Sequence, residues 1–201
     1  FVEPKIREYK KIKNKIKNNY LTSKINDENM SYIYSLSRIF KISEKSFVHS
    51  MKSFKGLSHR FEIFLKKKNV MFINDSKATS FVASSSAISS LSNIYWIIGG
   101  LPKKGDKIKL LNLKKNIIKC YLIGKNIKFF KRQIKNTIVY SITKNLRNSI
   151  IQIFKDIKLQ KKGEKSVLLS PAAASFDQFK NFEERGDEFK KLCKIYARKY
   201  F

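Results

Sequence analysis

The sequence predicts an α/β fold, in which a mostly parallel sheet with flanking helices follows a smaller, purely helical region. Two observations support this prediction. From about residue 61 to the end, short apolar segments of strand length alternate with segments of helical spacing, which is typical of parallel strands joined by crossover helices. Residues 27–54 show apolar side chains at helical spacing only, and the pattern changes near Gly56.

The helical region is predicted from local caps and from the spacing of its apolar side chains. Residues 1–19 are rich in lysine and show little periodicity, so we expect an exposed surface segment there. Asp27 is a suitable N-cap for a helix over 27–41. Ser43 is a suitable N-cap for a second helix, which ends near Phe54.

The second region alternates between the two kinds of pattern. The expected strands cover residues 61–65, 70–73, 94–98, 117–123, 138–140 and 166–169, and the expected helices cover 81–91, 127–134, 146–154 and 189–200. Ligands of parallel sheets gather at the carboxyl ends of the strands. The loops after Ile73, Ile98 and Leu169 are therefore the first candidates for a binding site.

Length and composition limit the classes of protein that fit. The chain has 201 residues and is 42% hydrophobic, which suffices for one ordinary domain and part of another. It begins with Phe1, so we treat it as a fragment. No window approaches the roughly 20 apolar residues of a membrane span. Cys120 and Cys193 lack metal-ligand spacing and are expected to be free thiols in a reducing compartment, with no metal site.

The net charge of +29 has two interpretations. A strongly basic chain can bind nucleic acid or another polyanion. The charge here comes from runs of Lys, Ile and Asn, as over residues 10–19, and arginine, the better phosphate reader, is scarce. A solvated basic surface without nucleic-acid binding is the favoured interpretation, and polyanion binding is the alternative.

Four segments contain residues that could carry chemistry. They cover residues 55–62, 74–79, 99–106 and 169–189. The second could be an ordinary helix cap, the third a mobile turn, and the phenylalanines of the fourth a core stripe. The third segment has two glycines at Walker spacing, but Asp106-Lys107 stands where such a loop needs Lys-Ser/Thr, so a nucleotide P-loop is rejected.

Taken together, these segments resemble the Mur ligase family, in order and spacing, over about residues 21–200. The resemblance rests on residues 54–60 at a domain junction, residues 74–79 (Asn-Asp-Ser-Lys-Ala-Thr), Gly99-Gly100 with Lys103, and residues 170–189. Within the family, the Asn-Asp-Ser-Lys-Ala-Thr segment is similar to that of the members that add D-glutamate. Another Mur-type or folylpolyglutamate ligase, a basic nucleic-acid-binding module and a degenerate fragment are the alternatives.

The resemblance implies a fold, a reaction and its partners. Residues 1–57 would be the end of a central ATP-binding domain, and residues 58–201 a Rossmann-like amino-acid-binding domain. The family is made up of ATP-dependent ligases that form carbon–nitrogen bonds in peptidoglycan precursor synthesis in the cytoplasm. The resemblance implies three substrates, namely ATP, UDP-N-acetylmuramoyl-L-alanine and D-glutamate, with Mg²⁺ as a cofactor. It also implies a monomer that does not bind a membrane. This chain lacks the P-loop and the UDP-binding domain, so we expect it to be inactive alone.

The resemblance also assigns site residues. Lys103 would pair with a D-glutamate carboxylate, in a pocket lined by Thr79, Ser175 and Phe182 and by the backbone of Phe176. The residues that would face the nucleotide are Asn26, Asn29, His59, Arg60, Asp75 and Lys77. Asp75 and Lys77 are also the catalytic candidates.

Overall fold

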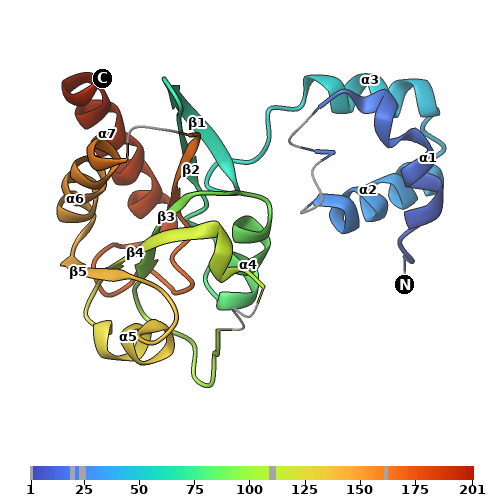
Figure 1. Ribbon diagram of the computed structural model, residues 1–201. Coiled ribbons are helices and arrows are strands. Elements are labelled where there is room, and N and C mark those ends of the chain that lie inside the picture. The colour runs from blue at the N-terminus through green and yellow to red at the C-terminus, as the bar shows by residue number, and fades with distance from the viewer. Residues whose placement is uncertain (1, 19–20, 23–25, 109–111, 161–162) are drawn as a thin grey trace. The chain divides into compact units, whose positions relative to one another are not determined.

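The computed structural model describes residues 2–18, 21–22, 26–108, 112–160 and 163–201, and the chain forms two compact units, Phe1–Gly56 and Leu57–Phe201 (Figure 1). The first unit contains the helices α1 (Ile6–Ile16), α2 (Asp27–Ile39) and α3 (Glu44–Ser53). Ser43 caps α3 as predicted, because its hydroxyl accepts from the Ser46 amide at 3.1 Å. The helices enclose an apolar cluster of Tyr9, Ile12, Ile16, Leu21, Met30, Tyr34 and Phe47.

The expectation of an irregular, exposed segment over residues 1–19 is wrong for most of its described part. Residues 6–16 form α1, and Tyr9, Ile12 and Ile16 are buried on one side of that helix. Their spacing of three and four residues is helical, and lysine is a good helix former. The lysines between them obscured this stripe, so a charge run was mistaken for a segment without structure.

The second unit is built on one six-stranded sheet in the order β1-β2-β6-β3-β4-β5. β1 is antiparallel to β2, and the remaining neighbours are parallel, which confirms the predicted α/β class. The strands are β1 (Glu62–Lys67), β2 (Val70–Asn74), β3 (Ile94–Gly99), β4 (Ile117–Ile123), β5 (Tyr140–Lys144) and β6 (Lys165–Leu169). The helices are α4 (Phe81–Ser89), α5 (Ile127–Ile134), α6 (Leu146–Leu159) and α7 (Phe182–Tyr200), with a short 3-10 helix at Lys114–Asn116.

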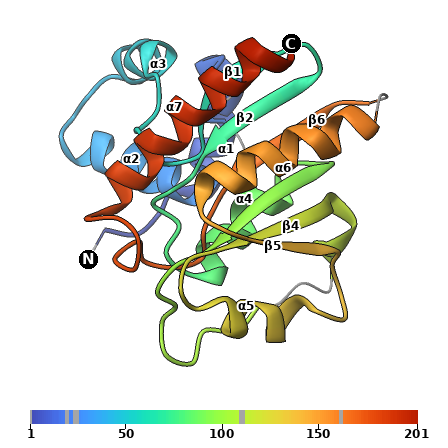
Figure 2. The ribbon, with the colours of Figure 1, turned by 90° about the vertical axis from the view of Figure 1, so that its left-hand side faces the viewer.

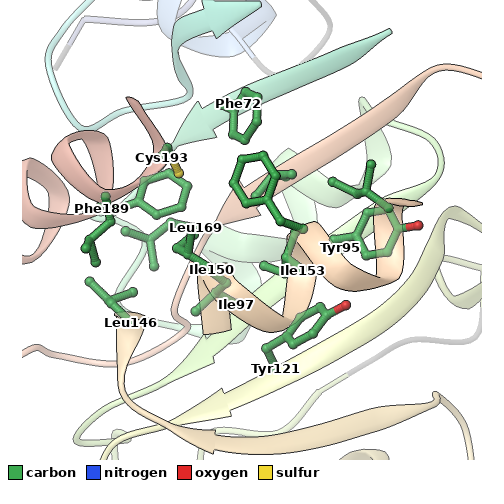
Figure 3. Close-up of a cluster of buried hydrophobic side chains, with 14 of the residues drawn as sticks. Phe72, Tyr95, Ile97, Tyr121, Leu146, Ile150, Ile153, Leu169, Phe189 and Cys193 are labelled. Atoms are coloured by element: carbon green, nitrogen blue, oxygen red, sulfur yellow. The ribbon is translucent and has the colours of Figure 1, made fainter. Parts of the chain in front are cut away.

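Helices cover both faces of this sheet, with α6 and α7 on one face and α4 on the other (Figures 1 and 2). The main core lies under α6 and α7, where Phe72, Tyr95 and Ile97 of the sheet pack against Ile150 and other helix residues (Figure 3). Every residue of β3 is buried, as expected for a central strand covered on both faces. The order of the strands places the carboxyl ends of β2, β6 and β3 side by side.

Three predicted boundaries are wrong by more than two residues. The helix predicted over 146–154 continues to Leu159 as α6. The fifth strand covers Tyr140–Lys144 rather than 138–140, because its polar residues lie on an edge strand that pairs only with β4. The last helix begins at Phe182, seven residues before the predicted start. Asn181 caps it by accepting from the Glu184 amide at 2.8 Å, and the helix continues through the buried Gly186.

Cys120 and Cys193 are free and buried, as predicted, and burial raises the pKa of both thiols. In the described part of the chain, no helix combines the length and apolar character needed to cross a bilayer.

Candidate functional site

Three loops leave the neighbouring carboxyl ends of β2, β3 and β6, and they are hydrogen-bonded to one another. The Gly99 amide donates to the Pro171 carbonyl at 3.0 Å. Leu101 and Ala174 exchange two backbone hydrogen bonds of 2.9 and 3.0 Å, so the loop after β3 is paired with the loop after β6. The chain leaves β2 for α4 on one face of the sheet and β6 for α7 on the other (Figure 2). Open α/β sheets bind ligands where connections diverge in this way.

Asp75 is a buried carboxylate at this edge. Asp75 is 8% exposed, and its backbone amide donates to the Leu169 carbonyl at 2.8 Å. Ser170 donates its hydroxyl to Oδ2 at 2.7 Å, and the Phe61 amide donates to Oδ1 at 3.1 Å. Burial raises the pKa of Asp75 to about 6, although these two hydrogen bonds and the nearby charge of Arg60 act in the opposite direction. At neutral pH the carboxylate is ionised and can accept further hydrogen bonds.

Replacing Asp75 with asparagine is expected to change how stability depends on pH. The folded-state pKa of about 6 lies above the ordinary value of 3.8, so the folded state binds this proton more tightly than the unfolded state. The resulting stability is complete below pH 3.8 and is lost as the pH rises through 6. Between pH 4 and pH 7 the unmodified chain should therefore lose up to about 3 kcal/mol relative to Asp75→Asn. Urea denaturation at several pH values measures this difference.

Asp156→Asn provides the control with the opposite sign. Burial alone would raise the pKa of Asp156, but hydrogen bonds from Lys119 and Tyr121 hold it below the ordinary value. The stability that this group contributes is present above its unfolded pKa and is lost as the pH falls. Parallel stability curves for Asp75→Asn and the unmodified chain would contradict the assigned shift.

His59 is enclosed by protein groups. It is 7% exposed, and its Nδ1 lies 3.0 Å from Asn74 Nδ2. Its ring packs edge-on against the Phe182 ring, with 5.8 Å between the two ring centres. Its Nε2 lies 3.9 Å from Asp187 Oδ1. A Cβ on Gly186 would lie within 3 Å of His59 Nδ1, so only a glycine at this position of α7 leaves room for the imidazole. The nucleotide contact of His59 stays a prediction, as does that of Arg60.

Lys77 and Phe182 come into contact, although the sequence assigned them to different ligands. Lys77 Nζ lies 3.8 Å from the centre of the Phe182 ring, which is within cation–π range. The Lys77 side chain is exposed, whereas Phe182 and Thr79, two residues after Lys77, are half-buried. The predicted nucleotide residues and the predicted D-glutamate residues therefore adjoin along the loop after β2.

Lys103 lies in an exposed turn of the loop after β3. Its carbonyl accepts from the Asp106 amide at 3.2 Å, and the Asp106 carboxylate accepts from the Phe81 amide at 2.9 Å, which fixes the turn to the start of α4. On the loop after β6, Ser175 is 2% exposed, whereas the Phe176 side chain is 70% exposed. The contacts of Lys103, Ser175 and the Phe176 backbone with D-glutamate stay predictions.

The remaining predicted residues, Asn26 and Asn29, belong to the first unit. They stand three residues apart at the start of α2, which places them on one side of that helix. Among the described residues, no group of three or more His, Cys, Asp or Glu side chains could hold a metal ion.

Ser170 and Arg185, for which the sequence predicted no role, are both fully buried at this edge. Ser170 donates to Asp75 and also pairs with Ser84 at 2.9 Å. Arg185 contacts the loops after β2 and β6. The position of Ser170 directly after a strand was the only local signal for it, and α7 was predicted to begin beyond Arg185.

Comparison with known proteins places the chain in a family. No protein-family model matches it. The UDP-N-acetylmuramoylalanine--D-glutamate ligase of Rhizobium meliloti is 44% identical over 148 residues, which cover 74% of this chain and 32% of the relative. The protein of the same name from Rickettsia prowazekii is 36% identical over 193 residues, covering 91% of this chain and 43% of the relative.

A solved structure shares the fold. The crystal structure of MurF from Acinetobacter baumannii matches with a TM-score of 0.63 and 12% identity, over 88% of this chain and 38% of that protein. The chain belongs to the Mur ligase family. Within the family, its curated relatives at 36% to 45% identity are D-glutamate ligases, and the chain spans between 31% and 43% of the length of these relatives.

Proposed function

We propose that this chain is the carboxy-terminal part of an ATP-dependent ligase that adds D-glutamate to UDP-N-acetylmuramoyl-L-alanine. The observation that supports this most is the meeting of the loops after β2, β3 and β6. These loops bring a carboxylate (Asp75), an ammonium group (Lys77) and hydroxyls (Thr79 and Ser175) to one edge of the sheet. The names of the curated relatives supply the substrates.

In this proposal the two compact units are parts of two domains. Residues 1–57 form the end of the ATP-binding domain, and residues 58–201 form the amino-acid-binding domain. The division of the chain after Gly56 is consistent with this boundary. The protein would act as a monomer in the cytoplasm, with the basic surface solvated and not bound to nucleic acid.

The reaction has two steps. The carboxylate of the UDP-linked L-alanine attacks the γ-phosphorus of ATP, and ADP leaves. The amine of D-glutamate then attacks the carbonyl carbon of the acyl phosphate, phosphate leaves with the electron pair of the broken C–O bond, and the amine nitrogen loses a proton. The chain would contribute the site that holds this amine beside the acyl phosphate, which accelerates the step by orientation.

The roles follow the loops. Lys103 would bind a carboxylate of D-glutamate, and Thr79, Ser175, Phe182 and the Phe176 backbone would enclose the same substrate. The nucleotide would be contacted by His59, Arg60, Asp75, Lys77, Asn26 and Asn29. Lys77 can neutralise phosphate charge, and ionised Asp75 can accept from a ribose hydroxyl. The described residues do not form a metal site, so we assign no Mg²⁺ ligand to this chain.

Amino-acid choice in a reconstituted ligase tests the proposal. This chain would replace the matching part of the Rhizobium meliloti relative, so that the relative supplies the rest of the enzyme. Phosphate release would be measured with ATP, magnesium, UDP-N-acetylmuramoyl-L-alanine and, separately, D-glutamate, L-glutamate, meso-diaminopimelate or L-alanine. We expect release with D-glutamate alone.

Two controls make the result interpretable. The unmodified relative should show the same preference, and this chain by itself should release no phosphate. Turnover with a different amino acid would retain the ligase reaction but contradict the proposed substrate. Release of phosphate by the isolated chain would contradict its role as one part of the enzyme.

A further inference from the structure

Arg185, on the first turn of α7, is buried to an unusual degree for its type. It is 1% exposed, and it ranks with Trp96 among the largest fully buried side chains. Burial lowers the pKa of its guanidinium to about 10, although the negative charge of Asp177 opposes the shift, so the group remains charged at neutral pH. A buried charge of this kind costs stability unless it is well hydrogen-bonded, and it is weak evidence for a purely stabilising role.

The hydrogen bonds of Arg185 join two of the three loops. Its Nε donates to the Ser76 hydroxyl at 3.0 Å, and its Nη2 donates to the Ser76 carbonyl at 2.8 Å. The same Nη2 donates to the Ala173 carbonyl at 3.0 Å. Ser76 in turn donates its hydroxyl to the Phe182 carbonyl at 2.8 Å, which ties the loop after β2 to the start of α7.

The third nitrogen of the guanidinium faces the third loop. A Cβ on Gly100 would stand 3.3 Å from Arg185 Nη1, so little more than the space of one side-chain atom separates the backbone after β3 from this group. Within the described residues, Nη1 is the one buried side-chain nitrogen or oxygen atom without a hydrogen-bond partner. The arrangement therefore leaves one nitrogen of the guanidinium unsatisfied, but the group joins the loops after β2 and β6 directly, and the Leu101–Ala174 hydrogen bonds extend this linkage to the loop after β3.

We propose that Arg185 is a positioning residue for the amino-acid site, which holds the loops after β2, β3 and β6 at the separation that D-glutamate requires. Ser76 lies between Asp75 and Lys77, and Ala173 lies two residues before Ser175. Displacing Ala173 would move Ser175, which would face D-glutamate, and displacing Ser76 would move Thr79 of the same site together with the nucleotide residues Asp75 and Lys77. The rigid, planar fork of arginine can bind both loops at once, whereas the single ammonium group of lysine cannot reproduce this geometry. The inference rests on the proposed function for the identity of the ligand, but not for the linkage of the loops.

Arg185→Met tests the linkage in this chain alone. Methionine fills most of the same volume without a buried charge, so overall unfolding should change far less than the loops do. We expect hydrogen–deuterium exchange at the amides of Ser76, Lys77 and Ala174 to become at least tenfold faster, while exchange in β3 and β4 changes less than threefold. Equal acceleration in loops and strands would show a merely structural role and overturn the proposal, as would unchanged loops.

The exposed Arg198 on the same helix provides the matched control, because Arg198→Met removes the same charge without touching the loops. Ser76→Ala is a second variant for the case that Arg185→Met does not fold. It removes one hydrogen-bond partner of Arg185 and should accelerate exchange at Ala174 to a smaller extent. No change at Ala174 in this folded variant would also overturn the linkage.

Kinetics of the reconstituted ligase test the effect on the substrate. Arg185→Met should raise KM for D-glutamate at least tenfold and lower kcat/KM about 100-fold. KM for ATP should rise by a clearly smaller factor, because only the Ser76 contact adjoins the nucleotide residues Asp75 and Lys77. Arg185→Lys should recover part of the loss. Equal changes in both KM values would overturn the assignment to the amino-acid site. If the unmodified reconstituted ligase did not use D-glutamate, the proposed function would fail, while the exchange result would still decide whether Arg185 links the loops.

Discussion

Replacing Gly99 with alanine is expected to lower the free energy of unfolding by about 4 kcal/mol. Gly99 ends β3 with a φ of +141°, in a region that only glycine occupies readily. An added Cβ would lie within 3 Å of three backbone atoms of Ile123 on the neighbouring strand, where neither backbone can move without breaking the β3–β4 pairing. Chemical denaturation of the purified variant measures the loss.

Gly105→Ala separates the clash from the backbone strain. Gly105 also has a positive φ, of +75°, but no atom lies within 4 Å of the position of its added Cβ. This control should lose only about 1 kcal/mol, the usual difference for a non-glycine residue in a left-handed conformation. An equal loss in both variants would mean that φ alone decides the cost and that the close approach to Ile123 is unimportant.

Replacing Lys103 with methionine in the reconstituted ligase should raise KM for D-glutamate by about 100-fold. A hydrogen bond to a charged group contributes about 1.5 to 3 kcal/mol, which corresponds to a factor of roughly 10 to 150 in binding. Methionine keeps an apolar stem of similar length, so packing is little changed. Because Lys103 would bind the carboxylate in both the ground state and the transition state, kcat should change by less than about threefold.

Lys104→Met is the matched control for Lys103. Both lysines are exposed in the same turn, so the two variants remove equal charge from the same loop. We expect KM for D-glutamate to change less than twofold in Lys104→Met. Similar increases in KM in both variants would mean that the overall positive charge of the chain, +29, causes the effect. That result would contradict a specific pairing of Lys103 with the substrate.

The prediction of the site from the sequence was strongest for loops that follow strands. The apolar runs ending at Ile73, Ile98 and Leu169 are local signals, and the loops that follow them do lie side by side. The individual ligand contacts of Asp75, Lys103 and Ser175 stay predictions, because local pattern does not report which groups a side chain meets.

The main errors concern two helices that begin in polar or charged sequence. In α1, Tyr9, Ile12 and Ile16 form a helical stripe, but the lysines between them suggested a solvated segment. In α7, the predicted helix starts at Phe189, but the helix begins at Phe182 after the Asn181 cap and includes Gly186. A helix that tolerates a buried glycine does so because a neighbour approaches closely, here the His59 imidazole, and this information is tertiary.

The sequence by itself determined the α/β class, the two regions, the candidate loops and the resemblance to the Mur ligases, because periodicity and short motifs are local properties. Only the tertiary structure decided that Ser170 donates to Asp75, 95 residues away, and that Arg185 donates to Ser76, 109 residues away. Both pairings exist because the chain returns from β5 to insert β6 between β2 and β3. The hydrophobic pattern predicts that a strand is buried. The order of the strands, however, depends on packing across the whole sheet, and this order determines which groups each buried polar side chain meets.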